Sequence, residues 1–113
     1  MDKIIERGLL FDFYGELLTE HQQRIYSEAV FNDLSLGEIS EEEGISRQGV
    51  HDLIKRCDKL LESYENKLKL IDKFQRIKNE IADIDKMLDC SGEISDSLKI
   101  NIKNGLKTII EDL

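Results

Sequence analysis

The sequence predicts an all-α protein, and three observations lead to this fold class. Apolar residues recur every three or four positions along almost the whole chain, and no stretch of five or more residues alternates strictly between apolar and polar. The 113 residues include no proline and only 7 glycines, whereas β-sandwiches and barrels need frequent turn residues. Charged residues make up 35% and hydrophobic residues 40%, which favours a packed core over disorder.

The N-terminal segment, residues 2–18, has the apolar spacing of a helix. Its apolar side chains recur at i, i+4, at Ile5, Leu9, Phe13 and Leu17, and with Leu10 and Tyr14 beside them they form one broad apolar face. Gly8 and Gly15 lower its intrinsic helix stability by about 1 kcal/mol each relative to alanine, so this helix needs a packing partner.

Capping signals divide the next part of the chain. Thr19 and Gln22 have the spacing of a capping box, and Ser35 begins the same pattern. Gly44 is placed to end the Ser35-led helix in the left-handed conformation, and Ser46 to cap the following helix. We therefore predict a second, a third and a fourth helix that begin after Thr19, Ser35 and Ser46.

A heptad-like stripe then runs through the C-terminal part. One helix from Ser46 to Leu88 and two helices broken near Asn66 fit the pattern equally well. A last helix follows the interruption at residues 89–92 and ends the chain. Either an internal core or a seam between two copies would explain so long a stripe. We expect a homodimer whose interface contains Leu68, Ile71, Phe74, Ile81, Ile84 and Leu88.

Charge is unevenly distributed, although the formal net charge is −8. Residues 47–78 carry 9 basic and 5 acidic side chains, whereas residues 1–46 carry 3 and 11, and residues 79–113 carry 4 and 8. The middle third is thus the only positive segment, and a phosphate-bearing partner is expected to meet the chain there.

Residues 34–56 have the spacing of a helix-turn-helix. Gly44 would form the sharp turn, Ser46 would cap the second helix, and small Ser40 and Gly49 would let the helices approach each other. The outer face of the second helix carries side chains that can reach base edges or phosphates. We predict that its DNA-binding residues are Ser46, Arg47, Gln48, His51, Asp52, Lys55, Arg56 and Lys59.

Two resemblances support this interpretation. The stretch resembles the region-4 helix-turn-helix of bacterial sigma factors, including its opening, Leu18-Thr19-Glu20-His21-Gln22. The chain is also similar, over residues 4–74, to the YlxM-like family in three blocks: Leu9-Leu10-Phe11-Asp12-Phe13-Tyr14-Gly15-Glu16-Leu17-Leu18-Thr19, Ser46-Arg47-Gln48-Gly49-Val50, and Leu60-Leu61-Glu62 with Tyr64, Glu65, Lys67 and Leu68. We accordingly expect a sigma region 4-like domain at residues 1–65 and a helical extension for dimerisation at residues 66–113.

The family resemblance also implies a function. Its members are small cytoplasmic bacterial proteins, described as DNA-binding regulators with a role in the signal recognition particle pathway. Double-stranded DNA is therefore the expected partner. The alternative is an interaction protein that binds the signal recognition particle GTPase or its RNA. The acidic run Glu41-Glu42-Glu43 favours that alternative, and Glu43 stands where the pattern has an apolar residue, so it needs solvent or a partner.

Other kinds of site have weaker signals. Asp12 and Glu16 are expected to be surface carboxylates, and His51 and Cys57 lie on different helical faces, which does not suit zinc. The aromatic residues of the first segment are expected to be core anchors rather than a stacking platform. We expect no enzyme, no cofactor and no metal. No apolar run approaches the roughly 20 residues of a membrane span, and no signal peptide is evident, so the expected location is the cytoplasm, with reduced cysteines.

Overall fold

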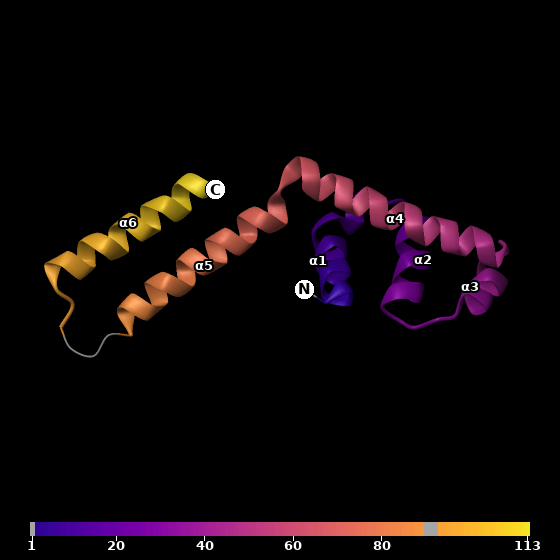
Figure 1. The fold of residues 1–113 in the computed structure, drawn as a ribbon, viewed down its shortest axis with the longest axis horizontal. Coiled ribbons are helices and arrows are strands. Elements are labelled where there is room, and N and C mark those ends of the chain that lie inside the picture. The colour runs from indigo at the N-terminus through magenta and orange to yellow at the C-terminus, as the bar shows by residue number, and fades with distance from the viewer. Residues whose placement is uncertain (1, 90–92) are drawn as a thin grey trace. The chain divides into compact units, whose positions relative to one another are not determined.

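The computed structural model describes residues 2–89 and 93–113, and these are helical with no strand. Figure 1 shows the elements in chain order: α1 (Lys3–Tyr14), the 3-10 turn η1 (Gly15–Leu17), α2 (Glu20–Val30), α3 (Leu36–Glu43), α4 (Arg47–Leu68), α5 (Leu70–Leu88) and α6 (Asp96–Asp112). The predicted all-α fold class is confirmed. The chain divides into two compact units, Met1–Lys69 and Leu70–Leu113, whereas the sequence placed the boundary after residue 65.

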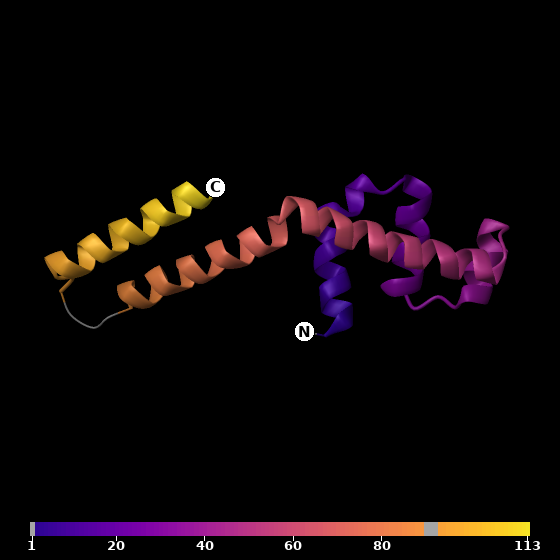
Figure 2. The ribbon, with the colours of Figure 1, turned by 45° about the horizontal axis from the view of Figure 1, so that its top comes forward.

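Helix α4 organises the first unit. It packs against α1, α2 and α3, and it crosses all three in Figures 1 and 2. Seven side chains in this unit are almost completely excluded from solvent: Tyr14, Ile25, Tyr26, Ile39, Val50, Cys57 and Leu61. Burying one large apolar side chain stabilises a fold by about 1.5–3 kcal/mol, so this cluster is the main source of the unit's stability.

Partly buried polar contacts join α1 and α2 to α4. The carboxylate of Asp58 accepts hydrogen bonds from the Tyr26 hydroxyl and from the Arg7 guanidinium, each at 2.6 Å. The Tyr14 hydroxyl donates to Glu65 at 2.5 Å. Each bond joins residues more than thirty positions apart, so together they fix how three helices cross.

The predicted apolar face of α1 is confirmed only in part. Ile5 and Leu17 are each 56% exposed, whereas Leu10 and Tyr14 are buried. The core-facing stripe therefore lies on the neighbouring side of the helix, together with Arg7, which reaches Asp58. The apolar spacing identified one broad face of the helix but not which part of that face is buried.

The predicted caps are confirmed. Capping boxes are formed by Thr19 with Gln22 and by Ser35 with Glu38, and the Ser46 hydroxyl accepts from the N–H of Gly49 at 2.9 Å. The long C-terminal stripe was compatible with one continuous helix or with two helices, and the structure has two. Helix α4 ends at Leu68, its C-cap Lys69 adopts the left-handed conformation with φ 57°, and α5 begins at Leu70.

The second unit is an antiparallel hairpin of α5 and α6, seen side by side in both views (Figures 1 and 2). Ile84 of α5 lies against Gly105 of α6, where an added Cβ would come within 3.1 Å of the isoleucine side chain. Gly105 thus lets the helices approach closely. Half-buried Ile77, Ile102 and Ile109 continue this seam.

Candidate nucleic-acid interface

The helix-turn-helix consists of α3, a tight turn and α4. Gly44 ends α3 in the left-handed conformation at φ 68°, which costs a residue with a Cβ about 1–2 kcal/mol. The Ser40 hydroxyl donates to the carbonyl oxygen of Ile45 at 2.5 Å, which fixes the corner. The expected role of Gly49 needs correction, because a Cβ there would meet Ser46 and Ile45 rather than α3.

A small dry core supports this motif from beneath. Ile25 of α2, Ile39 of α3 and Val50 of α4 are each 0% exposed and form one cluster. Partly buried apolar side chains pack around it: Ala29, Leu34, Ile45, Leu53 and Ile54. The inner face of α4 is thereby anchored on both preceding helices, and its outer face points away from the core.

The predicted DNA-binding residues lie on that outer face or along its edges. All are exposed except His51, which is half-buried: Ser46, Arg47, Gln48, Asp52, Lys55, Arg56 and Lys59. Four of them are cations, and Asp52 is the one carboxylate of the set. The row has the charge and the accessibility that a phosphate-bearing ligand requires.

Several of these side chains already have neighbours. The Gln48 side-chain amide donates to the Asp52 carboxylate at 2.9 Å, and His51 Nδ1 lies 3.7 Å from the same carboxylate oxygen. The Arg47 guanidinium lies over Gly37 of α3, where an added Cβ would come within 3.0 Å of it. Gly37 therefore leaves room for the guanidinium at the start of α4.

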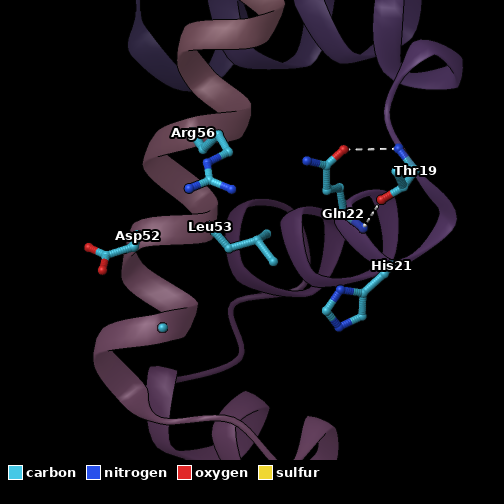
Figure 3. Close-up of a pocket in the computed structure, with 7 residues that line it drawn as sticks. Thr19, His21, Gln22, Asp52, Leu53 and Arg56 are labelled. Atoms are coloured by element: carbon cyan, nitrogen blue, oxygen red, sulfur yellow. Dashed lines mark hydrogen bonds between the residues drawn. The ribbon is translucent and has the colours of Figure 1, made fainter.

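A pocket flanks the outer face of α4 on the side of α2. It has a volume of about 330 Å³ and is lined by Thr19, His21, Gln22, Gly49, Asp52, Leu53 and Arg56. Figure 3 shows Leu53 pointing from α4 toward α2, whereas the Asp52 carboxylate points away from α2. The sequence identified Thr19 and Gln22 only as a cap, because nothing in the chain indicated that this helix start would face Arg56.

Glu43, which stands at an unusual position, has two partners on α2. Its carboxylate accepts two hydrogen bonds from the Arg24 guanidinium, at 2.7 and 2.9 Å, and its Oε2 lies 3.6 Å from His21. The hydrogen bonds from Arg24 lower the pKa of Glu43. The acidic run therefore exposes two carboxylates, those of Glu41 and Glu42, rather than three.

A second pair of carboxylates lies beside this ion pair. Burial raises the pKa of Glu28, and the neighbouring Glu42 carboxylate raises it further. The face shared by α2 and α3 is thus acidic even after Glu43 is neutralised, and it favours a cationic partner.

The residues expected at a dimer interface divide into two groups. Leu68, Phe74, Ile81 and Leu88 are about half exposed, whereas Ile71 and Ile84 are buried within the chain. Ile84 is covered by α6, so it is not available to a second copy while the hairpin is formed.

The aromatic residues of α1 belong to the core. Phe11 stacks on Tyr26 with ring centroids 5.7 Å apart and contacts Phe31 at 5.3 Å, and Tyr14 is 1% exposed. Within residues 2–89 and 93–113, no group of three or more metal-ligating side chains occurs. No helix in the same ranges is both long and apolar enough to cross a membrane.

Comparison with known proteins agrees with the motif. Residues 1–101 match the UPF0122 family, described as "Putative helix-turn-helix protein, YlxM / p13 like". The UPF0122 protein of Acetivibrio thermocellus is 43% identical over 116 residues, which cover 98% of this chain and 99% of that protein. The UPF0122 proteins of Shouchella clausii and Bacillus mycoides are 44% and 41% identical, over 78% and 88% of this chain and 81% and 90% of theirs. The chain therefore belongs to the UPF0122 family of YlxM/p13-like helix-turn-helix proteins.

Proposed function

We propose that the first unit binds double-stranded DNA in a regulatory role, with α4 as its recognition helix. The observation that carries this proposal is the row of exposed cations on α4, opposite a fully buried face. Arg47, Lys55 and Arg56 are exposed, whereas Val50 and Cys57 on the same helix are 0% exposed. A helix anchored in this way can enter a major groove about 12 Å wide without loss of its core contacts.

In this proposal, residues in the first turns of α4 recognise the DNA bases. Arg47 and Lys55 offer donors to guanine acceptors, Gln48 can pair with adenine, and the Asp52 carboxylate can accept from the amino group of cytosine. The hydrogen bond between Gln48 and Asp52 orients both side chains before DNA arrives. The two residues then act as one contact rather than two.

Residues along the edges of the same face of α4 contact the DNA phosphates in this proposal. Arg56 and Lys59 are exposed there, and Arg56 lines the pocket at the start of α2. Helix starts carry a partial positive charge, so a DNA phosphate at this pocket would meet two favourable groups, the start of α2 and the Arg56 guanidinium.

The test is a salt titration of duplex binding, measured by fluorescence anisotropy. Lys55→Ala is expected to weaken binding by about 5- to 100-fold and to relax sequence preference. Arg56→Ala is expected to weaken all duplexes similarly and to lower the slope of log affinity against log salt by about 1. Lys107→Ala, which removes an exposed lysine from α6, is the matched control.

The proposal includes a homodimer, because two-fold related recognition helices can then read half-sites about 34 Å apart, one turn of the duplex. Unchanged affinity in both α4 variants across the salt titration would exclude α4 as the DNA-binding surface. It would leave the helix-turn-helix as a scaffold for another partner.

The acidic face of α2 and α3 favours a second candidate function. In this candidate function the protein binds the signal recognition particle GTPase or its RNA, as the family resemblance implies, and the acidic face would meet a basic surface of the GTPase. The exposed Glu42 carboxylate beside Glu28 motivates it. Capture from a bacterial lysate with Glu42→Lys and Arg56→Ala as baits separates the two functions. Loss of the particle component with Glu42→Lys alone supports this candidate, and recovery of DNA alone counts against it.

A further inference from the structure

The hairpin of α5 and α6 has a thin core for an independent unit. It contains 44 residues, Leu70–Leu113, and only Ile71 and Ile84 among its described side chains are buried apolar residues. Units of this size rarely bury enough surface to be stable without a further stabilising contact, often oligomerisation. The hairpin therefore needs another layer against it.

Large apolar side chains remain exposed on both helices. On α5 these are Ile81 and Leu88, at 53% and 52% exposure. Leu106 and Ile110 of α6 and the adjoining C-terminal Leu113 are 48%, 69% and 79% exposed. We refer to these five residues as the hairpin face.

Helix geometry places the five residues on one side of the hairpin. At 3.6 residues per turn, Ile81 and Leu88 lie about 60° and about 40° from Ile84 around the axis of α5. Leu106 and Ile110 lie about 100° and about 140° from Gly105 around the axis of α6, in the same sense of rotation. Because the helices are antiparallel, rotation in the same sense from the seam brings both stripes to the same side of the hairpin.

We propose that a second copy of this chain covers the hairpin face, so that two hairpins form a four-helix bundle. The five residues expose on the order of 500 Å² per copy, and a stable interface buries about 800 Å² per partner once its polar rim is included. The face therefore has the size of an interface core. It differs from the heptad stripe of α5 alone, because it excludes Ile84 and includes α6.

Charge along the rim specifies how the copies are arranged. Asp85 borders the face on α5 and Lys103 borders it on α6, and both are exposed. They lie at the same height along the hairpin, since Ile84 is beside Gly105. A two-fold axis parallel to the helices places α5 over α6 of the other copy, so Asp85 meets Lys103 of the partner subunit. If each helix instead packed antiparallel against its own copy in the partner, Asp85 and Lys103 would not meet.

The test is size-exclusion chromatography with light scattering on the full chain, without DNA. The wild type is expected at twice the chain mass of 13.1 kDa. Ile110→Glu is expected to raise the dimer dissociation constant at least about 100-fold, because it buries a charge in the apolar core. Ile100→Glu is the matched control, since Ile100 is 58% exposed and lies outside the hairpin face, roughly a quarter turn around α6 from Ile110.

Circular dichroism is expected to show unchanged helix content in both variants, because both isoleucines are exposed in the single chain. A reversed pair tests the arrangement: Asp85→Lys or Lys103→Asp alone weakens the dimer, and the two together restore it. A monomeric wild type, or equal behaviour of Ile110→Glu and Ile100→Glu, overturns the proposal. It rests on the homodimer of the proposed function and not on DNA binding, so a monomer that still binds DNA would refute this inference and that homodimer and would leave the DNA-binding role of α4 standing.

Discussion

The Asp58 network allows a quantitative test of how the first unit is held together. Asp58 of α4 accepts hydrogen bonds from the hydroxyl of Tyr26 on α2 and from the guanidinium of Arg7 on α1. Asp58→Ala removes both acceptors in one step. Because the donors come from two other helices, the substitution removes polar contacts that set both crossings.

The expected loss of stability in Asp58→Ala follows from the burial of the two hydrogen-bond donors. Tyr26 is 0% exposed and is covered by Phe11, so in Asp58→Ala its hydroxyl would have neither an acceptor nor water. An unsatisfied buried hydroxyl lowers the free energy of unfolding by about 1–3 kcal/mol. The ion pair of Arg7 and Asp58 is about a quarter exposed and adds about 1 kcal/mol after solvent screening. Asp58→Ala should therefore destabilise the unit by about 3 kcal/mol, a fall of roughly 15 °C in Tm for a domain of this size.

Tyrosine signals make the assay specific for the first unit. The chain has no tryptophan, and its 3 tyrosines, Tyr14, Tyr26 and Tyr64, all lie within Met1–Lys69. Circular dichroism in the tyrosine band, at longer wavelength than the phenylalanine bands, thus reports this unit during urea unfolding without a contribution from Phe74 of the hairpin. Asp12→Ala, which removes an exposed carboxylate from α1, is the control and should change stability by less than about 0.5 kcal/mol.

A double-mutant cycle tests the reasoning directly. Tyr26→Phe removes the hydroxyl and keeps the ring, so its cost and that of Asp58→Ala should overlap by about 1 kcal/mol or more in the double variant. If the two costs are additive, or if Asp58→Ala costs less than about 1 kcal/mol, the buried hydrogen bond does not contribute as described.

Three further predictions concern the turn, the core and the acidic run. Gly44→Ala should cost about 1–2 kcal/mol in urea unfolding through backbone strain alone, since no atom lies within 4 Å of an added Cβ. Burial raises the pKa of the Cys57 thiol to about 11. In a Cys90→Ser variant, Cys57 should therefore be alkylated at pH 8 only when the protein unfolds. Fast alkylation of the native protein would contradict the burial of Cys57. Arg24 lowers the pKa of Glu43, so the stability that this ion pair provides is present above the usual carboxyl pKa range and is lost as pH falls through the pKa of Glu43 in the folded protein. In Glu43→Gln, the midpoint of urea unfolding should therefore fall less steeply as the pH is lowered. An identical fall in both proteins would count against the pair.

Local signals explain why much of the helix-turn-helix was predictable. The caps at Thr19, Ser35 and Ser46 and the left-handed Gly44 involve residues within four or five positions of one another. Such contacts depend on chain chemistry alone, so the sequence is enough to identify them. The exposed outer face of α4 follows from the same local order once the inner face is assigned to the core.

The remaining features depend on contacts between distant residues. Arg24 meets Glu43 nineteen positions later, and Arg7 meets Asp58 across fifty-one. Glu43 needed a partner on physical grounds, but its identity required the crossing of α2 and α3. The pocket beside Arg56 was missed for the same reason, because it exists only where the start of α2 faces α4.

The stripe of α5 shows what periodicity leaves open. Ile81 and Ile84 are three residues apart in one repeat, yet Ile81 is 53% exposed and Ile84 is 8% exposed. A heptad pattern indicates that residues face something apolar every third or fourth position, and it does not say whether that surface is the same chain or another. Lys69 adds to this ambiguity, since it ends α4 in a left-handed conformation that usually requires glycine or asparagine, and so no residue signal marks the break. One apparent seam therefore contains two surfaces. The part against α6 holds the hairpin together, and the part that remains exposed, with Ile110, is where a second copy should bind.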